Sequence, residues 1–178
     1  MNIVIIYVFL FFQKKTFSDI GYTKKHFFRN IVFGFFWAII LFIIVIVLSP
    51  IVQYLIGPNY TNLVSTVLGN VSQGFLNKLI FALNILVGAG ITEELQRIFF
   101  LNQFEILGGR VGLFVGVILT SAVFGYLHSP QGMNAAIIVG FVGLVLALIY
   151  IKRRQAVEVS AAHFFYDFIV FVIFLLVK

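Results

Sequence analysis

Residues 30–48 read NIVFGFFWAIILFIIVIVL, an apolar run without a single charged side chain. Runs of about 18 or more apolar residues are typical of membrane-spanning helices. The rest of the chain shares this bias: 62% of its 178 residues are hydrophobic, 10% are charged, and the mean hydropathy is +1.12. A soluble domain has about 25% charged residues on average. The sequence cannot supply the polar surface of a soluble fold, and it predicts an integral membrane protein.

Further apolar segments lie on both sides of this run. The predicted helices are a partial first helix at 1–12, the run at 30–48 ending at Ser49-Pro50, and segments at about 76–108, 111–128, 133–151 and 157–177. Residues 51–75 are the most loop-like part, where we expect a short interfacial helix. Gly88-Ala89-Gly90 predicts that the third segment is broken or re-entrant.

The predicted fold class is therefore all-α: a polytopic transmembrane helical bundle of about six membrane helices. A single membrane domain is expected over residues 1–178, with a motif-bearing catalytic core at about 76–177.

The basic residues lie in alternate short loops, and the net charge is +6. The positive-inside rule predicts that the basic loops 13–29 and 152–154, together with Arg110, are cytoplasmic in a multi-pass protein of the cell membrane. Membrane lipid is thus an expected partner. No basic stripe with interleaved aromatic residues stands apart from the spans, so nucleic acid is not expected. The absence of cysteine excludes disulfides, thiolate metal sites and a cysteine nucleophile.

Ionisable residues inside apolar segments are the candidates for function, since a charge at membrane depth costs several kcal/mol. They form three groups, each on its own predicted helix: Glu93-Glu94 with Arg97, Phe124 with His128, and His163 with Asp167. Within each group the residues are three or four positions apart, which places them on one helix face. Each group alone has a structural explanation, namely an ion pair, a helix cap or a His–Asp hydrogen bond. Three such groups together favour a catalytic site.

The chemistry of these residues leaves two routes open. Glu93, His128 and His163 can bind a divalent metal such as Zn²⁺ and leave one position for water. The same residues can also work without metal, with the glutamate activating water and His163 and Asp167 stabilising the oxyanion. Both routes hydrolyse an acyl bond, and no other cofactor is predicted. Glu105 and Glu158 lie near span ends and are expected at the membrane interface.

In this order the three groups resemble the CPBP family of membrane proteins, which includes CAAX-type prenyl endopeptidases and bacteriocin-processing or bacteriocin-immunity proteins. The family pattern is a double glutamate followed by arginine, then Phe-x-x-x-His, then His-x-x-x-Asn or a similar residue. The resemblance covers residues 93–167. Two residues separate Glu94 from Arg97 where the family usually has three, and Asp167 stands where asparagine is commoner.

The resemblance implies roles for the catalytic candidates. Glu93 would be the water-activating base or the metal-facing carboxylate, and His128 would assist it. His163 and Asp167 would polarise the scissile carbonyl. The remaining residues of the motifs, Glu94, Arg97 and Phe124, would support the site.

The leading hypothesis is therefore a membrane protease, an intramembrane endopeptidase that acts by a glutamate-dependent or a metalloprotease mechanism on a peptide or protein substrate, lipidated or not. The second is a non-catalytic membrane protein that confers immunity or binds a partner. The third is a small transporter or proton relay, since buried carboxylates and histidines also serve there. No duplicated halves support the third hypothesis.

Overall fold

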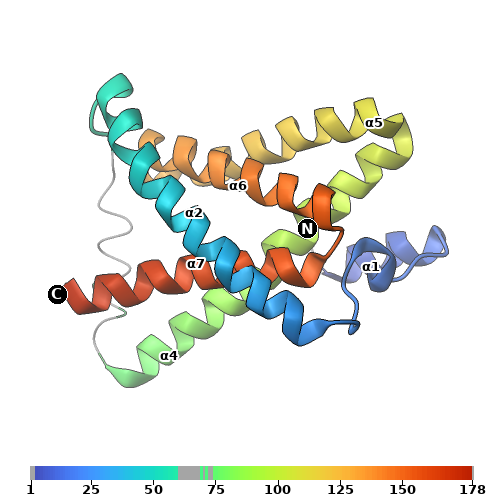
Figure 1. Ribbon diagram of the computed structural model, residues 1–178, viewed down its shortest axis with the longest axis horizontal. Coiled ribbons are helices and arrows are strands. Elements are labelled where there is room, and N and C mark those ends of the chain that lie inside the picture. The colour runs from blue at the N-terminus through green and yellow to red at the C-terminus, as the bar shows by residue number, and fades with distance from the viewer. Residues whose placement is uncertain (1–2, 60–68, 70, 72–73, 178) are drawn as a thin grey trace.

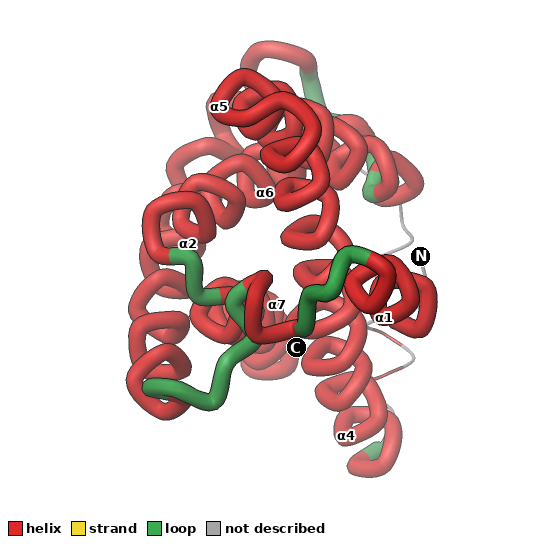
Figure 2. Tube along the Cα trace, turned by 90° about the vertical axis from the view of Figure 1, so that its right-hand side faces the viewer, coloured by secondary structure: helices red, strands yellow, loops and turns green. Residues whose placement is uncertain are grey.

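The computed structural model describes residues 3–59, 69, 71 and 74–177, and within these ranges the chain is helical with no β-strand (Figures 1 and 2). The elements in chain order are α1 (Ile3–Phe12), a 3₁₀ turn (Phe17–Ile20), α2 (Phe27–Ile56), α4 (Phe75–Asn84), a π-helix (Ile85–Glu93), α5 (Glu94–Leu127), a second 3₁₀ turn (Ser129–Gln131), α6 (Met133–Arg153) and α7 (Ala156–Val177).

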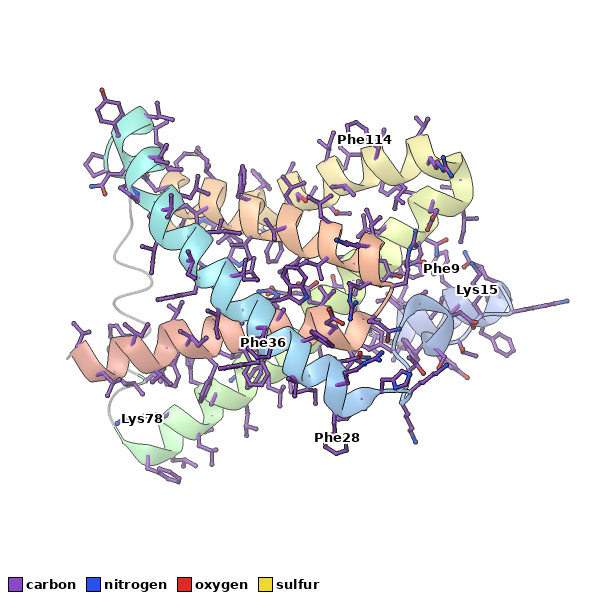
Figure 3. The ribbon with its side chains drawn as sticks, in the orientation of Figure 1. Phe9, Lys15, Phe28, Phe36, Lys78 and Phe114 are labelled. Carbon is purple, nitrogen blue, oxygen red and sulfur yellow. The ribbon has the colours of Figure 1, made fainter. Side chains whose placement is uncertain are left out.

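Four of the described helical segments are long and apolar enough to cross a membrane: Phe27–Ile56, Phe75–Leu127, Met133–Arg153 and Ala156–Val177. The prediction of a transmembrane helical bundle is confirmed, but the number of about six spans is not. Much of the outer surface is apolar, as lipid-facing helices require. Phe28 and Phe114 project away from the bundle (Figure 3) and are 82% and 66% exposed.

The longest segment, Phe75–Leu127, turns back on itself at Gly109 (Figure 1). Gly109 has φ 56° and ψ −138°, a conformation that suits a residue without Cβ. The bend divides the segment into a first arm, residues 75–108, and a second arm, residues 110–127. These arms correspond to the predicted third and fourth helices.

The predicted end of the second helix at Ser49-Pro50 was wrong, because α2 continues to Ile56. Proline removes one backbone donor, so the carbonyl four residues earlier loses its partner. The Ser49 hydroxyl donates to the carbonyl of Val45 (2.7 Å) and stabilises the backbone beside the proline. Membrane helices tolerate proline when such side chains satisfy the nearby backbone. Of the stretch 51–75 predicted to hold an interfacial helix, residues 51–56 belong to α2, and residues 60–68, 70, 72 and 73 lie outside the described residues.

The predicted break at Gly88-Ala89-Gly90 takes another form. The helix is continuous but widened, with π-helical turns from Ile85 to Glu93. The hydroxyl of Thr92 donates to the carbonyl of Val87, five residues earlier (2.7 Å). Such π-turns occur frequently at functional sites. This one ends at the predicted glutamate pair.

α7 is packed between α2 and the π-helix, and glycines allow both contacts. A Cβ on Gly34 of α2 would lie 2.5 Å from the Cβ of Ala161. A Cβ on Gly90 of the π-helix would lie 2.9 Å from the Cβ of Phe164. Small residues let membrane helices approach closely. The sequence therefore fixes the position of α7, which carries His163, from two sides.

The basic loops meet at one end of the bundle, on the right in Figure 1. The backbone of Gly21 accepts a hydrogen bond from the N–H of Ala156 (3.0 Å). Glu105, which precedes the bend, accepts two hydrogen bonds from Arg154 (2.6 and 2.7 Å). These loops therefore share one end of the bundle, and the side of the membrane on which they lie stays a prediction.

Gly34→Ala should lower the free energy of unfolding by about 1–3 kcal/mol, the usual cost of overpacking. Gly108 is the matched control, because it is also helical but a Cβ there would meet nothing within 4 Å. Gly108→Ala should leave stability unchanged or slightly higher. Thermal unfolding of both variants in the same detergent measures the difference. Equal effects would contradict the close packing of α2 on α7.

Candidate active site

Glu94 is the most enclosed ionisable side chain of the three motifs, with 0% of its surface exposed. Arg97 donates from Nη2 to its Oε2, and His163 donates from Nδ1 to its Oε1 (2.7 Å). Arg97 lies one turn further along α5, whereas His163 comes from α7. This buried carboxylate therefore joins the first and third motifs.

His163 also faces Asp167 one turn later on α7, with 3.6 Å between Nε2 and Oδ2. This distance is longer than a good hydrogen bond. With Nδ1–H directed at Glu94, the ring has its second nitrogen on the side of Asp167. The ring orientation is thus fixed by one carboxylate and influenced by another.

Phe124 lies where the three motifs meet. Its ring centroid is 4.8 Å from that of His128, 5.6 Å from that of His163, and 4.8 Å from the guanidinium carbon of Arg97. Cations and ring edges are attracted to an aromatic face. Gly143 of α6 packs closely against the Phe124 ring, because a Cβ there would lie 2.9 Å from the ring.

His128 ends α5, and its Nδ1 donates to the carbonyl of Phe124 (2.8 Å). The helix cap, which is the structural explanation for His128, is therefore present. The same hydrogen bond also defines a tautomer, since a neutral ring that donates from Nδ1 keeps a free lone pair on Nε2. Capping the helix and accepting a proton are compatible roles for this side chain.

Glu93 differs from its neighbour in every respect that matters for reactivity. It is partly exposed, and among the described residues its carboxylate forms no hydrogen bond or ion pair. It lines a cavity of about 400 Å³ between the two arms of the bent segment. Both Glu93 and His128 interact electrostatically with Asp167. The structure thus brings together all of the predicted site residues around one region.

The bend at Gly109 determines how close His128 lies to Glu93. His128 lies about 17 residues along the second arm, which is roughly 25 Å of helix. With straight spans that distance would separate His128 from Glu93. The bend at Gly109 returns the second arm alongside the first, so Phe124 reaches Arg97.

The predicted metal ligands do not form a ligand group as they are placed. Within residues 3–59, 69, 71 and 74–177, no three histidine, aspartate or glutamate side chains are grouped so that they could hold a metal ion. His163 already directs one nitrogen at Glu94. A divalent ion such as Zn²⁺ at Glu93, His128 and His163 stays a prediction that this arrangement does not fit.

Glu158 was expected at the membrane interface, and the structure shows that its side chain is buried inside the protein in the first turn of α7. It is 0% exposed, and its carboxylate accepts hydrogen bonds from Trp37 Nε1 (2.8 Å) and from Arg153 Nε and Nη2 (3.0 and 3.1 Å). The position near a span end concealed this role, because sequence does not show which helix will cover it. The single tryptophan, Trp37 inside the apolar run 30–48, was the available signal.

Tyr22 is a second residue that the sequence did not indicate. Its hydroxyl forms a 2.9 Å hydrogen bond with the hydroxyl of Ser160, one turn before His163. Burial raises the pKa of this phenol, so the group stays neutral. The loop that precedes α2 is thereby attached to α7 beside the site.

The fold and the site together define a class of protein: a helical membrane protein with buried glutamate and histidine side chains beside an apolar cavity. The family model of the type II CAAX prenyl endopeptidase Rce1-like proteins matches residues 75–169. This range is more than half of the chain, and the chain belongs to that family. The resemblance predicted from the motifs is confirmed. Neither a curated protein nor a solved structure matched the chain.

The matched range begins at the first residue of α4 and ends within α7 just beyond Asp167. It therefore includes all three motifs and both arms of the bent segment. Membership of this family implies a CAAX-type intramembrane protease whose substrate is a peptide or protein in a membrane.

Removing the Glu94 carboxylate should destabilise the protein much more than removing the Glu93 carboxylate. Glu94→Ala leaves Arg97 buried without its partner, which costs about 3–5 kcal/mol. Glu93→Ala removes a carboxylate that makes no hydrogen bond with a described residue, so stability should change by less than about 1 kcal/mol. Unfolding in mixed detergent micelles measures both. Equal losses would show that Glu93 has a structural partner.

The chain's one tryptophan can report on Glu158. Glu158→Leu removes the acceptor of the Trp37 indole N–H, so the emission maximum should move to shorter wavelength. Glu158→Gln keeps an acceptor oxygen and should shift it less. Steady-state fluorescence in detergent makes the comparison. Identical spectra for Leu and Gln variants would contradict the Trp37–Glu158 hydrogen bond.

Proposed function

We propose that the chain is an intramembrane endopeptidase that hydrolyses a peptide bond with water activated by Glu93 and His128. The observation that carries this proposal is the contrast within the glutamate pair. Glu94 is fully engaged by Arg97 and His163, whereas Glu93 makes no such contact with a described residue and lines the cavity. A carboxylate that no described side chain pairs, in a cavity that also borders histidine-bearing helices, suits a general base.

The reaction begins when Glu93 takes a proton from a water molecule and the water oxygen attacks the scissile carbonyl carbon. His128 assists through the free lone pair of Nε2. The tetrahedral intermediate carries a negative oxygen, which is stabilised by donation from the His163 ring. Proton transfer from Glu93 to the amide nitrogen then breaks the C–N bond and releases an amine and a carboxylic acid.

Glu94 and Asp167 act on His163 rather than on the substrate. Two carboxylates flanking one imidazole favour its positively charged form, in which both nitrogens carry protons. Asp167 thereby orients and charges the ring instead of contacting the oxyanion, which an ionised aspartate would repel. No step of this mechanism passes through a metal ion.

The proposal also includes a location: the chain is a multi-pass protein of the cell membrane, with loops 13–29 and 152–154 on the cytoplasmic side. Its expected substrate is a membrane peptide or protein of the CAAX type, lipidated at the residue that anchors it. Bacteriocin-related processing is the second substrate class within the same chemistry. A non-catalytic immunity or partner-binding protein is the alternative that the following experiment separates.

Glu93→Ala, His128→Ala and His163→Ala should each reduce cleavage at least about a hundredfold, since general acid–base groups contribute about 10²–10⁴ in rate. Protein N-termini and matching C-terminal fragments are compared in membranes from cells that make wild-type or Glu93→Ala protein at equal levels. Fragments present only with wild type would reveal the substrate. Adding a chelator to the same membranes tests the metal route directly.

Glu105→Ala is the matched control, because Glu105 lies on the same bent segment but is paired with Arg154 at its far end. It should leave the fragments unchanged. A correctly inserted Glu93→Ala protein that produced the wild-type fragments would overturn the protease proposal. If the protein still has its effect in cells but no Glu93-dependent fragment is formed, the partner-binding alternative is favoured.

A further inference from the structure

The cavity beside Glu93 is a groove between the two arms of the bent segment, and we call it the arm groove. One wall comes from the first arm and the other from the second arm. Its lining residues are Glu93, Gln96, Arg97, Phe100, Phe104, Leu119, Thr120, Val123, Phe124 and Leu127. On each arm successive lining residues are one, three or four positions apart, which is the spacing of one helix face, so two helix faces are directed at each other.

One end of the arm groove is closed by Phe104. A Cβ on Gly116 of the second arm would lie 2.8 Å from the Cβ of Phe104, and a Cβ on Gly112 would collide with its backbone carbonyl. These two glycines are four residues apart, the spacing at which membrane helices accept a close neighbour. The aromatic ring is therefore seated where the arms converge toward the bend at Gly109.

The other end of the arm groove carries its polar groups. Glu93 and Arg97 line it there, and Phe124 is shared with His128 and His163. From Glu93 to Phe104 the first arm rises 11 residues, which is roughly 16 Å at about 1.5 Å per residue. The groove thus leads from the proposed reaction centre to an aromatic end wall.

We propose that the arm groove binds apolar side chains of the substrate next to the scissile bond, and that Phe104 determines their permitted size. This inference rests on the proposed protease function. A volume of about 400 Å³ is in the range of small ligand sites and admits a few side chains rather than a folded segment. A substrate whose carbonyl reaches Glu93 extends into this space without leaving the apolar walls.

A substrate fits the arm groove better than a bilayer lipid does. The lining residues Glu93, Gln96 and Arg97 are at the catalytic end, where a peptide backbone needs donors and acceptors, and the walls beyond are apolar except for Thr120. A lipid chain gains from the walls alone. Phe104 is therefore a specificity-determining residue, and it has no part in the proton transfers.

The test uses the full-length protein reconstituted in liposomes. The probes are internally quenched peptides with a farnesylated cysteine, in which each following residue in turn is Ala, Leu, Phe or Trp. Phe104→Leu and Phe104→Ala should progressively raise kcat/KM for the Phe and Trp peptides relative to the Ala peptide. A size change in an apolar pocket is expected to alter such ratios by about 10–200-fold.

Phe114→Ala is the matched control, since Phe114 is an exposed phenylalanine of the second arm that does not line the arm groove (Figure 3). Its peptide ranking should equal that of wild type. A uniform change across all peptides in the Phe104 variants, with the ranking unchanged, would overturn this inference and favour a lipid in the groove. If wild type cleaves none of the peptides and produces no Glu93-dependent fragments in membranes, the proposed function fails instead.

Discussion

The carboxylate of Glu94 must be compensated, because it lies inside an apolar bundle with no exposed surface. An ionised group in such a place is tolerated only with partners of good geometry. Arg97 and His163 are those partners, and they reach it from α5 and α7. An arrangement that separates α7 from α5 leaves Glu94 with Arg97 alone and removes the hydrogen bond from His163. The position of α7 against α5 is therefore tied to the requirement that this buried carboxylate be fully paired.

The same requirement explains why two adjacent glutamates can have different chemistry. Consecutive residues on a helix differ in direction by about 100°, so only one of them can face Arg97 and His163 together. Glu94 takes that direction and is held there. Glu93 is directed at the arm groove instead. The two-residue spacing before Arg97 places it three positions after Glu94, which is a favourable distance for an ion pair on one face.

Much of this arrangement could be predicted from the sequence, because hydropathy and short helical spacings are local properties. The spans after residue 76 and all three motif groups were identified in that way. The π-helix was not, since whether glycines break or widen a helix depends on what packs against them, here Phe164. The burial of Glu158 depends likewise on contacts between distant segments, whereas the turn at Gly109 lies at the predicted boundary between segments 76–108 and 111–128. Local patterns thus identify the reactive residues but not the enclosure around them.

α7 shows how that enclosure gives the site its precision. Within its first turns, three polar side chains each bind a different part of the chain: Glu158 binds Trp37 of α2, Ser160 binds Tyr22 of the preceding loop, and His163 binds Glu94 of α5. Each contact has a direction, which the surrounding apolar packing lacks. Rotation of α7 by even one residue would break all three contacts. His163 is consequently held by interactions outside the reaction itself, which is the preorganisation that a water-activating site requires.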